Sequence, residues 1–308
     1  MKLFKRLRGG QGRKDLPARL TEKRGTDRKA GRAGRVKKQE GQQERQQMEH
    51  GLKIVTFNLR GSWQGDGINA FVHRAGGILH KLDLEEPDVV CFQEVSEQIN
   101  DFLRRHLPEY LILYRGRYEK MDGEGLAVAI RRSTVEVLSA DCFWLSPAPY
   151  EPGSRFEEQS DCPRICQVLL MRCLDTGEVF WVYNNHLDHI SDSARILGIR
   201  QVLERVWEDR QKFEFPVFVL GDFNAYPGSE TIRYCNEYEK FPIVNLTQDC
   251  GCTCHEFGKL GEDGGQIDYI YADRATAAKK HEIAIWKDET DGIYLSDHYP
   301  VALSIALS

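Results

Sequence analysis

Six short apolar runs in this chain each carry an Asn, Asp, Glu or His near one end, and this arrangement strongly limits its possible folds. Runs of about four to eight residues rich in Val, Ile and Phe are typical of β-strands. Rigid strands hold the loops at their ends, so polar side chains placed there can converge on one site. The polar ends are Asn58, Glu94, Asn185-His186, Asp222 with Asn224, Asp268, and Asp297-His298.

The predicted strands are spread along residues 51–308. Leu52–Asn58 alternates and is β-branched, and Asp88–Gln93 is a continuous apolar run that fits a buried strand. A turn at residues 175–177 separates two further runs, which predicts a hairpin of Ile165–Leu170 with Val179–Asn184. Gly125–Ile130 and Thr134–Leu145 are predicted as another pair, and further strands at Pro216–Leu220, Ile267–Tyr271 and Tyr299–Leu307.

Helices are predicted between these strands. Residues 192–209 place Ile196, Ile199, Leu203 and Val206 on one face, with Ser191 as the N-cap. Residues 68–84 and 96–106 show weaker helical patterns. Because strands outnumber helices and their order is mixed, the pattern favours an α+β fold over a parallel βαβ series.

Residues 1–50 form a strongly basic segment, with 16 Lys and Arg against 6 Asp and Glu. The segment contains a single aromatic residue, Phe4, and cannot bury enough apolar surface to offset the entropy of ordering. We therefore expect a disordered tail. It is a solvated arm without a specific role, a tether to nucleic acid or anionic membranes, or a stretch before a true start at Met48.

Residues 51–308 suit one large domain, because no Gly-, Ser- or Pro-rich linker divides them. They carry 26 basic and 41 acidic residues, which argues mildly against binding long nucleic acid through phosphate contacts. The hydrophobic content of 41% excludes a wholly disordered chain. No run of 18 apolar residues is present, so we expect no transmembrane helix and no membrane partner.

The polar residues at the strand ends suit metal-assisted attack on phosphorus. Carboxylates bind hard cations such as Mg²⁺, which polarise a phosphoryl oxygen and stabilise the leaving oxygen. A His beside a buried Asp orients or activates water, or donates to a phosphoryl oxygen. Any one of these residues alone is more often structural, since an Asp-Asn pair after a strand is usually a turn former. Their joint occurrence favours the catalytic interpretation.

Six motifs follow one another along the chain: Thr56–Gly61, Pro87–Val95, Asn185–His189, Gly221–Ala225, Ile267–Ile270 and Ser296–Pro300. Together and in this order they resemble the endonuclease/exonuclease/phosphatase superfamily, and further short matches resemble a mostly bacterial, poorly characterised branch of it. The resemblance runs from Ile54 to the C-terminus. It implies a four-layer α/β sandwich of two packed mixed β-sheets flanked by helices, with the site at one end.

The resemblance also implies a role for each residue. Glu94 ligates a divalent metal, Mg²⁺ or Mn²⁺, with Asn58 and Asp297 beside it or in its shell. Asp222 and Asn224 orient the attacking water and the scissile phosphate, and His186 contacts the phosphate or stabilises the transition state. His298, paired with Asp268, is a general base or a phosphate-stabilising residue. Either Asp222 or the histidine takes the proton from the water.

Three further residues are candidate substrate contacts. Arg164 stands at a predicted strand start facing the site, where it binds phosphate or forms a surface salt bridge. Asp188 lines the substrate pocket or only caps the following helix. His255 belongs to Thr253-Cys254-His255, which resembles a Thr-Phe-His element of the bacterial branch and could approach the substrate.

The nine cysteines are scattered and odd in number, which predicts a reduced, cytoplasmic protein. Cys250, Cys252 and Cys254 invite a zinc hypothesis, but zinc ligands are usually spaced as two C-x2–4-C pairs. The alternative interpretation is a strand whose three cysteines share one face.

The sequence thus predicts a Mg²⁺- or Mn²⁺-dependent hydrolase that cleaves a phosphodiester or phosphomonoester by metal-assisted water attack. One alternative is a nuclease on DNA or RNA, either an endonuclease or a deadenylase-like 3'-5' exonuclease. A remote alternative is a catalytically inactive binding module that kept the scaffold. The expected partner is a phosphate ester, either a small molecule or nucleic acid, and the sequence does not determine the oligomeric state.

Overall fold

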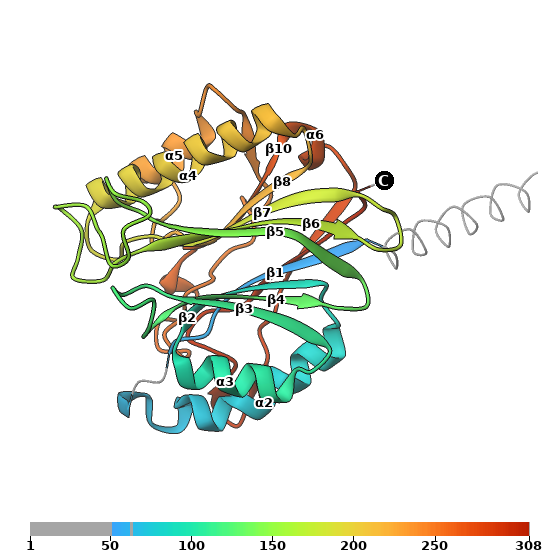
Figure 1. Cartoon of the computed structure of the whole chain (residues 1–308). Coiled ribbons are helices and arrows are strands. Elements are labelled where there is room, and N and C mark those ends of the chain that lie inside the picture. Colours follow the sequence, from blue (N-terminus) through green and yellow to red (C-terminus); the bar gives the residue numbers. More distant parts are fainter. Residues whose placement is uncertain (1–50, 62–63, 308) are drawn as a thin grey trace, which may run out of the picture. The chain divides into compact units, whose positions relative to one another are not determined.

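Two six-stranded β-sheets pack face to face, and helices cover the outer face of each (Figure 1). The structure, a computed structural model, describes residues 51–61 and 64–307, so the basic tail and Met48 lie outside the described residues. The predicted α+β sandwich of four layers is confirmed.

The first sheet contains both of the earliest predicted strands. Its strand order is β11 (His281–Ile285), β14 (Val301–Ile305), β1 (Leu52–Asn58), β2 (Val89–Val95), β4 (Gly125–Arg131) and β3 (Tyr110–Gly116). β1 and β2 run parallel, and the other neighbours pair antiparallel.

The second sheet contains the predicted hairpin. Its strand order is β5 (Val135–Trp144), β6 (Ile165–Cys173), β7 (Val179–His186), β8 (Val217–Asp222), β10 (Asp268–Asp273) and β9 (Ile243–Asn245). β7 and β8 run parallel, and the other neighbours in this sheet pair antiparallel. A separate small ribbon pairs β12 (Glu289–Thr290) with β13 (Ile293–Tyr294).

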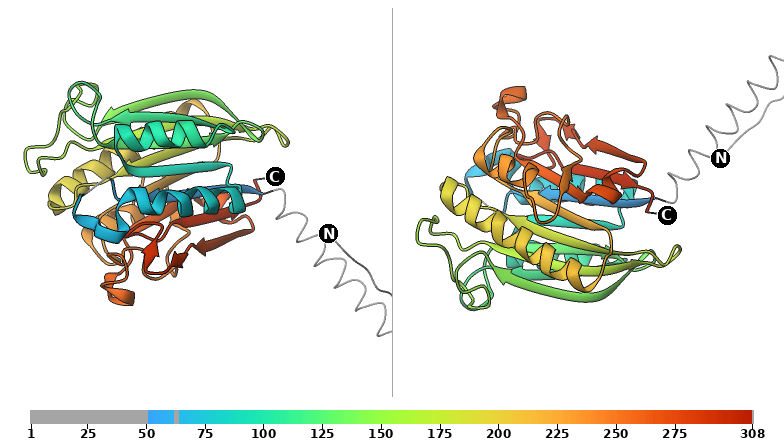
Figure 2. Two further views of the ribbon diagram at one scale, coloured as in Figure 1. Left: turned by 90° about the horizontal axis from the view of Figure 1, so that it is seen from below. Right: turned by 90° about the horizontal axis from the view of Figure 1, so that it is seen from above.

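The helices form the outer layers, as Figure 2 shows from two sides. α2 (Phe71–Glu85) and α3 (Glu97–His106) cover the first sheet, and α4 (Asp192–Lys212) with α5 (Glu230–Asn236) covers the second. Ser191 caps α4 as predicted, because its side chain accepts a hydrogen bond from the Ala194 amide. The shorter helical segments are η1 (Gln64–Asn69), η2 (Gly261–Gly264) and α6 (Arg274–Ala277).

Side-chain alternation along β1 divides the core into layers. Ile54 points between the two sheets, where it packs with Phe180 and Phe218. Val55 and Phe57 point the other way, into the layer beneath α2 and α3. Burial of each such side chain stabilises the fold by about 1.5–3 kcal/mol, so the strands that carry the polar ends are firmly held.

Four details of the predicted secondary structure are wrong. Gly125–Ile130 and Thr134–Leu145 do not pair, because β4 joins the first sheet and β5 the second. β3 and β11 were not predicted from the sequence, nor were the short elements β9 and α5. α2 begins at Phe71, three residues later than predicted. Residues 250–255 form no strand, only a single bridge between Cys254 and His298.

The strand directions bring all six polar ends to one end of the sandwich. β1 and β2 are parallel, as are β7 and β8, so Asn58, Glu94, His186 and Asp222 lie at carboxyl ends. β10 runs antiparallel to β8, and its first residue, Asp268, is directly paired with Asp222. Each sheet therefore delivers part of one polar cluster.

Gly221 is needed for the close approach of β7 and β8 just before Asp222. Its φ is +142°, and a Cβ atom there would lie 1.8 Å from the Asn185 carbonyl oxygen. We expect Gly221→Ala to lower the free energy of unfolding by about 3 kcal/mol or more. Gly76→Ala in α2 is the matched control, since a Cβ meets nothing within 4 Å there. Equal urea midpoints for the two variants would contradict the predicted need for glycine at position 221.

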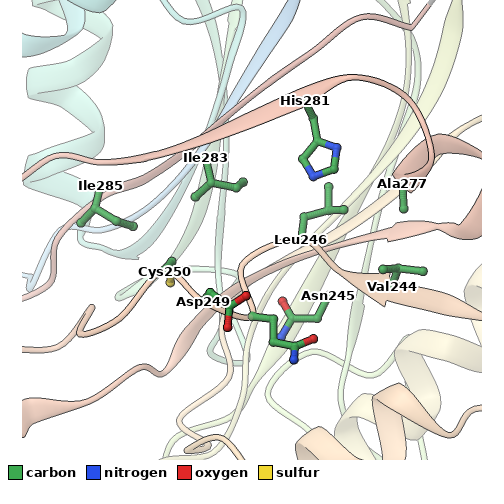
Figure 3. Close-up of a pocket in the computed structure, with 10 residues that line it drawn as sticks. Val244, Asn245, Leu246, Asp249, Cys250, Ala277, His281, Ile283 and Ile285 are labelled. Atoms are coloured by element: carbon green, nitrogen blue, oxygen red, sulfur yellow. The ribbon is translucent and has the colours of Figure 1, made fainter.

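A cavity of about 480 Å³ lies between the segment that follows β9 and the edge strand β11 (Figure 3). Ile283 and Ile285 line one side, and Leu246 and Asp249 line the other. None of its ten lining residues is a predicted site residue. This cavity is therefore separate from the predicted site residues at the strand ends.

Candidate functional site

Asp222 occupies the centre of the polar cluster and is 1% exposed. Its Oδ2 accepts a hydrogen bond of 2.9 Å from Asn58 Nδ2, which crosses from the first sheet to the second. The same oxygen lies 3.5 Å from His186 Nε2 and 3.9 Å from His298 Nε2. Burial raises the pKa of Asp222 to about 6, and the neighbouring carboxylate of Asp268 adds to this effect. The structure thus brings three predicted residues, Asn58, His186 and His298, around one carboxylate oxygen of Asp222.

Asp268 and His298 form the predicted pair. His298 Nδ1 lies 2.8 Å from Asp268 Oδ2, and both side chains are buried. Burial opposes the charged imidazolium, but the carboxylate and its hydrogen bond outweigh burial and raise the pKa of His298 well above its ordinary value. The Nε2 of His298 therefore faces Asp222 as a proton donor.

Glu94 is the next-to-last residue of β2 and lies beside the first-sheet part of the cluster. Its Oε1 accepts a 3.1 Å hydrogen bond from Asn58 Nδ2, so the Asn58 amide bridges Glu94 and Asp222. Burial raises the pKa of Glu94 to about 7, with further contributions from the negative charges of Glu124 and Asp297. A site that crowds carboxylates in this way favours a cation between them.

Three residues that flank this cluster have left-handed backbone conformations. They are Arg60 (φ 53°), Glu94 (φ 55°) and Asn224 (φ 49°). For residues other than glycine this conformation costs about 1–3 kcal/mol each, and such strain concentrates at functional sites. The surrounding sheets hold these residues against that cost.

The donor set fits a hard divalent cation on the Glu94 side. Glu94 and Asp297 offer carboxylate oxygens, which Mg²⁺ prefers. The Asn58 oxygen accepts a 2.8 Å hydrogen bond from the Arg60 amide. Its second lone pair remains available to a cation, while its Nδ2 orients the two carboxylates beside it.

A second arrangement of possible ligands is less suited to a cation. Single ligand atoms of Asp222, Asp268 and His298 lie within 4.8 Å of one another. His298 Nδ1, however, is bonded to Asp268, whose carboxylate raises the pKa of His298 and so favours its protonated form, which is a poor metal ligand. This trio suits proton handling better than metal ligation. No group of three such residues includes a cysteine in the described part of the chain, so the zinc hypothesis gains no support.

His186 and Asn224 complete the centre. Burial lowers the pKa of His186 well below its ordinary value, and the charges of Arg164 and Arg117 add to this effect. A neutral His186 results. The backbone amide of Asn224 donates to Asp222 Oδ1 at 2.8 Å, while its side-chain Nδ2 donates to the Leu187 carbonyl at 3.1 Å. Asn224 thus fixes the orientation of Asp222.

Arg164 is a buried guanidinium beside this centre, 5% exposed. Its Nη2 lies 2.9 Å from His189 Nδ1, while its Nε and Nη1 are buried without a partner. No carboxylate forms an ion pair with it among the described residues. Burial and the charge of Arg117 lower its pKa. A buried cation without an acidic partner is costly, so this position favours an anionic ligand.

Arg117 is a site residue that the sequence analysis missed. It follows the unpredicted strand β3, is 7% exposed, and its Nη1 lies 2.7 Å from Glu124 Oε1. Its charge reaches both Arg164 and His186. Prediction of β3 would have placed Arg117 at the same end of the sheet as Asn58.

A buried polar layer beneath the site was also missed. Gln93 Nε2 donates to Asn184 Oδ1 at 2.9 Å and thereby joins the two sheets. Both side chains are fully buried. The only sequence signal was polarity inside two otherwise apolar strands.

Asp188 organises a loop. Its Oδ1 accepts hydrogen bonds from the Ile190 and Ser191 amides at 3.0 and 2.7 Å, and its Oδ2 accepts from the amide and hydroxyl of Ser160. At 2% exposure, the carboxylate has no capacity left for substrate. Asp188 therefore fits the predicted role at the start of α4 better than the role of lining the substrate pocket.

His255 is likewise fully buried. Its ring stacks on Tyr299 with centroids 3.7 Å apart, and its Nδ1 accepts a hydrogen bond from the Gly258 amide. Its own amide donates to the Asp297 carbonyl at 2.9 Å. Its position therefore supports the segment that carries Asp297, while its buried Nε2 has no hydrogen-bond partner.

Comparison with known proteins decides the family. Residues 55–298 match the model of the endonuclease/exonuclease/phosphatase family. The chain belongs to this family. Its site therefore sits on a scaffold of hydrolases that act on phosphate esters. No curated protein sequence matches the chain.

Several solved structures share the fold over most of the chain. A family member from Bacteroides vulgatus has 24% identity and a TM-score of 0.74, covering 83% of this chain and 99% of its own. A protein of unknown function from Enterococcus faecalis has 27% identity and a TM-score of 0.74, covering 83% and 100%. A mannosyl-6-phosphatase from Bacteroides thetaiotaomicron has 23% identity and a TM-score of 0.73, covering 82% and 99%.

Proposed function

We propose that this chain is a Mg²⁺- or Mn²⁺-dependent phosphoesterase that hydrolyses its substrate by direct attack of water. One observation carries the proposal. The Asp222 carboxylate is held between Asn58, His186 and the Asp268–His298 pair, next to the crowded carboxylates of Glu94 and Asp297. A strained, buried arrangement of this kind has no structural purpose that an apolar packing would not serve better.

Each residue has a role in the proposed reaction. Glu94 and Asp297 would hold the cation, which supplies charge to polarise the phosphoryl oxygen and stabilise the leaving group. Asp222 accepts the proton of the attacking water, since His298 is already protonated and bonded to Asp268. Neutral His186 and charged His298 donate to the non-bridging oxygens as negative charge develops on them.

Arg164 supplies the proposed contact with the substrate anion, and Arg117 strengthens the local positive field. Both guanidiniums are buried, so each is worth more to an anion than a surface charge is. The net acidic charge of residues 51–308 favours a small phosphate ester over long nucleic acid. A nuclease remains the second candidate because the family includes enzymes of that name.

Two other expectations stand as proposals. All residues of the predicted catalytic set are present and assembled, which favours an enzyme over an inactive binding module. The nine cysteines are all free thiols, which supports a reducing, cytoplasmic location. No helix in the described part of the chain is long and apolar enough to cross a membrane.

The test is a substrate panel with metal control. Sugar phosphates, a small phosphodiester and single- and double-stranded oligonucleotides are incubated with the full chain after chelation, and again after Mg²⁺ or Mn²⁺ is restored. We expect turnover of a small phosphate ester only with metal. Full activity in excess EDTA, or no hydrolysis of any member, would overturn the proposal. Faster cleavage of oligonucleotides would select the nuclease.

Arg164→Gln should weaken substrate binding more than it slows turnover. Removal of a charged hydrogen bond to an anion costs about 2–3 kcal/mol, so KM should rise by roughly 30- to 160-fold. Arg172→Gln is the control, because Arg172 pairs with Glu136 on the exposed surface of β6. Steady-state kinetics on the best substrate measure the difference. An unchanged KM in Arg164→Gln would show that the guanidinium does not contact the anion.

A further inference from the structure

Arg74 is a fully buried arginine that the proposed chemistry does not use. It lies in the first turn of α2, is 1% exposed, and is the largest fully buried side chain of the described residues. The rings of Phe71 and Phe257 cover its guanidinium at 5.7 and 5.6 Å. Burial of a cation at such a position costs several kcal/mol unless hydrogen bonds compensate for it.

The side chain of Arg74 donates hydrogen bonds to backbone carbonyls of two distant segments, residues 59–60 and residue 295, and to the nearby Asn69 carbonyl. Its Nη1 donates to the Leu59 carbonyl at 3.0 Å and to the Leu295 carbonyl at 2.8 Å. Its Nε donates to the Asn69 carbonyl at 2.5 Å, and its Nη2 to the Arg60 carbonyl at 3.3 Å. A planar guanidinium can span four carbonyls in fixed directions, which a lysine ammonium cannot.

The two segments are those that carry the proposed metal side of the site. Leu59 and Arg60 directly follow Asn58, whose amide orients Glu94. Leu295 lies two residues before Asp297, whose Oδ2 is 3.4 Å from Arg60 Nη1. Arg74 therefore clamps the loop after β1 to the segment before β14. The relative position of Asn58 and Asp297 depends on this clamp.

We propose that Arg74 is a positioning residue for the metal site, holding the Asn58 and Asp297 segments at the spacing that a divalent cation requires. The inference rests on the proposed metal-dependent function. Residues behind metal ligands typically change metal affinity by about 10- to 100-fold when they are replaced. Arg74 acts through backbone carbonyls and touches neither substrate nor cation.

The experiment compares Arg74→Lys with Arg131→Lys. Arg131 lies at the far end of the first sheet and also binds backbone and side-chain oxygens, Pro87 O at 3.4 Å and Tyr110 Oη at 2.9 Å. Both variants lose a guanidinium clamp, and thermal unfolding measures how much stability each of them loses. Mn²⁺ affinity is then measured by titration calorimetry on folded protein without substrate.

We expect the Kd for Mn²⁺ to rise about tenfold or more in Arg74→Lys and to stay unchanged in Arg131→Lys. A wild-type Kd in Arg74→Lys would overturn the inference and leave the proposed function standing. Equal losses of affinity in both variants would also overturn it, because general destabilisation would explain them. If the wild-type chain binds no Mn²⁺, the proposed function fails and the inference fails with it.

A measurement on the wild-type chain covers the case in which Arg74→Lys does not fold. Coupling between two sites is reciprocal, so a clamp that favours metal binding must itself be stabilised by bound metal. We expect saturating Mg²⁺ to slow hydrogen exchange at Arg74 Nε by about tenfold or more, with no change at Arg131 Nε. Equal exchange rates at Arg74 with and without Mg²⁺ would overturn the inference.

Discussion

Glu94→Gln is expected to abolish most turnover and to leave the fold intact. The glutamine keeps the shape of the side chain and its contact with Asn58, but it removes a negative charge from a hard cation. Loss of several kcal/mol of transition-state stabilisation corresponds to a fall in kcat of about 10³-fold. Excess Mg²⁺ should restore part of the activity if the loss reflects weaker metal binding.

Thermal unfolding without metal separates catalysis from stability in this variant. Burial and neighbouring carboxylates raise the pKa of Glu94, so removal of its charge should not destabilise the metal-free chain. Glu85→Gln is the matched control, since Glu85 pairs with Lys53 and Lys81 on the surface. Near wild-type kcat in Glu94→Gln would contradict the assignment of Glu94 to the metal.

Asp268→Asn is expected to reduce kcat on the order of 10³-fold with little change in KM. The carboxylate fixes the ring of His298 through Nδ1 and stabilises its charged form. Without that charge, the pKa of His298 should fall, and Nε2 should lose its proton where negative charge develops. The kinetic constants and the NMR titration of His298 measure the two effects together.

Asp209→Asn controls for the loss of a buried carboxylate elsewhere. Asp209 is 4% exposed and accepts hydrogen bonds from Tyr183 and Arg205 in α4. Its replacement should lower stability and spare kcat. If Asp268→Asn behaves like Asp209→Asn, the pair with His298 is structural only.

The sequence predicted the strand ends well because the signal there is local. A buried apolar run followed by Asn58, or by Asp222 and Asn224, is visible in a few residues of sequence. The resemblance to the superfamily then predicted which strand ends would meet. The hydrogen bond between Asn58 and Asp222, 164 residues apart, agrees with that expectation.

The sequence could not predict how fully each polar group would already be satisfied. Asp188 has the residue type of a substrate contact, yet hydrogen bonds from Ser160, Ile190 and Ser191 occupy its carboxylate. His255 is buried against Tyr299, and its Nε2 is left without a hydrogen-bond partner. Arg74 and Arg117 stand outside every motif, and only the packed fold reveals that both are buried near the site. Burial and partner count depend on long-range packing, which local pattern does not encode.

The pairing of β4 and β5 failed for a related reason. The two strands are consecutive in the chain and close enough for a hairpin, so local rules favour their pairing. Instead the chain crosses from the first sheet to the second after Arg131, and β4 pairs with β2 and the unpredicted β3. Recognition of β3 as an edge strand would have left β4 no free partner for β5.

The position of bound Mn²⁺ in crystals of the wild-type chain, located by its anomalous scattering, tests the proposed metal site. We expect an ion in direct contact with a Glu94 carboxylate oxygen, on the side that Asp297 occupies, with the Asp268–His298 hydrogen bond intact. An ion enclosed instead by Asp222, Asp268 and His298, or no bound ion at saturating Mn²⁺, would contradict this expectation.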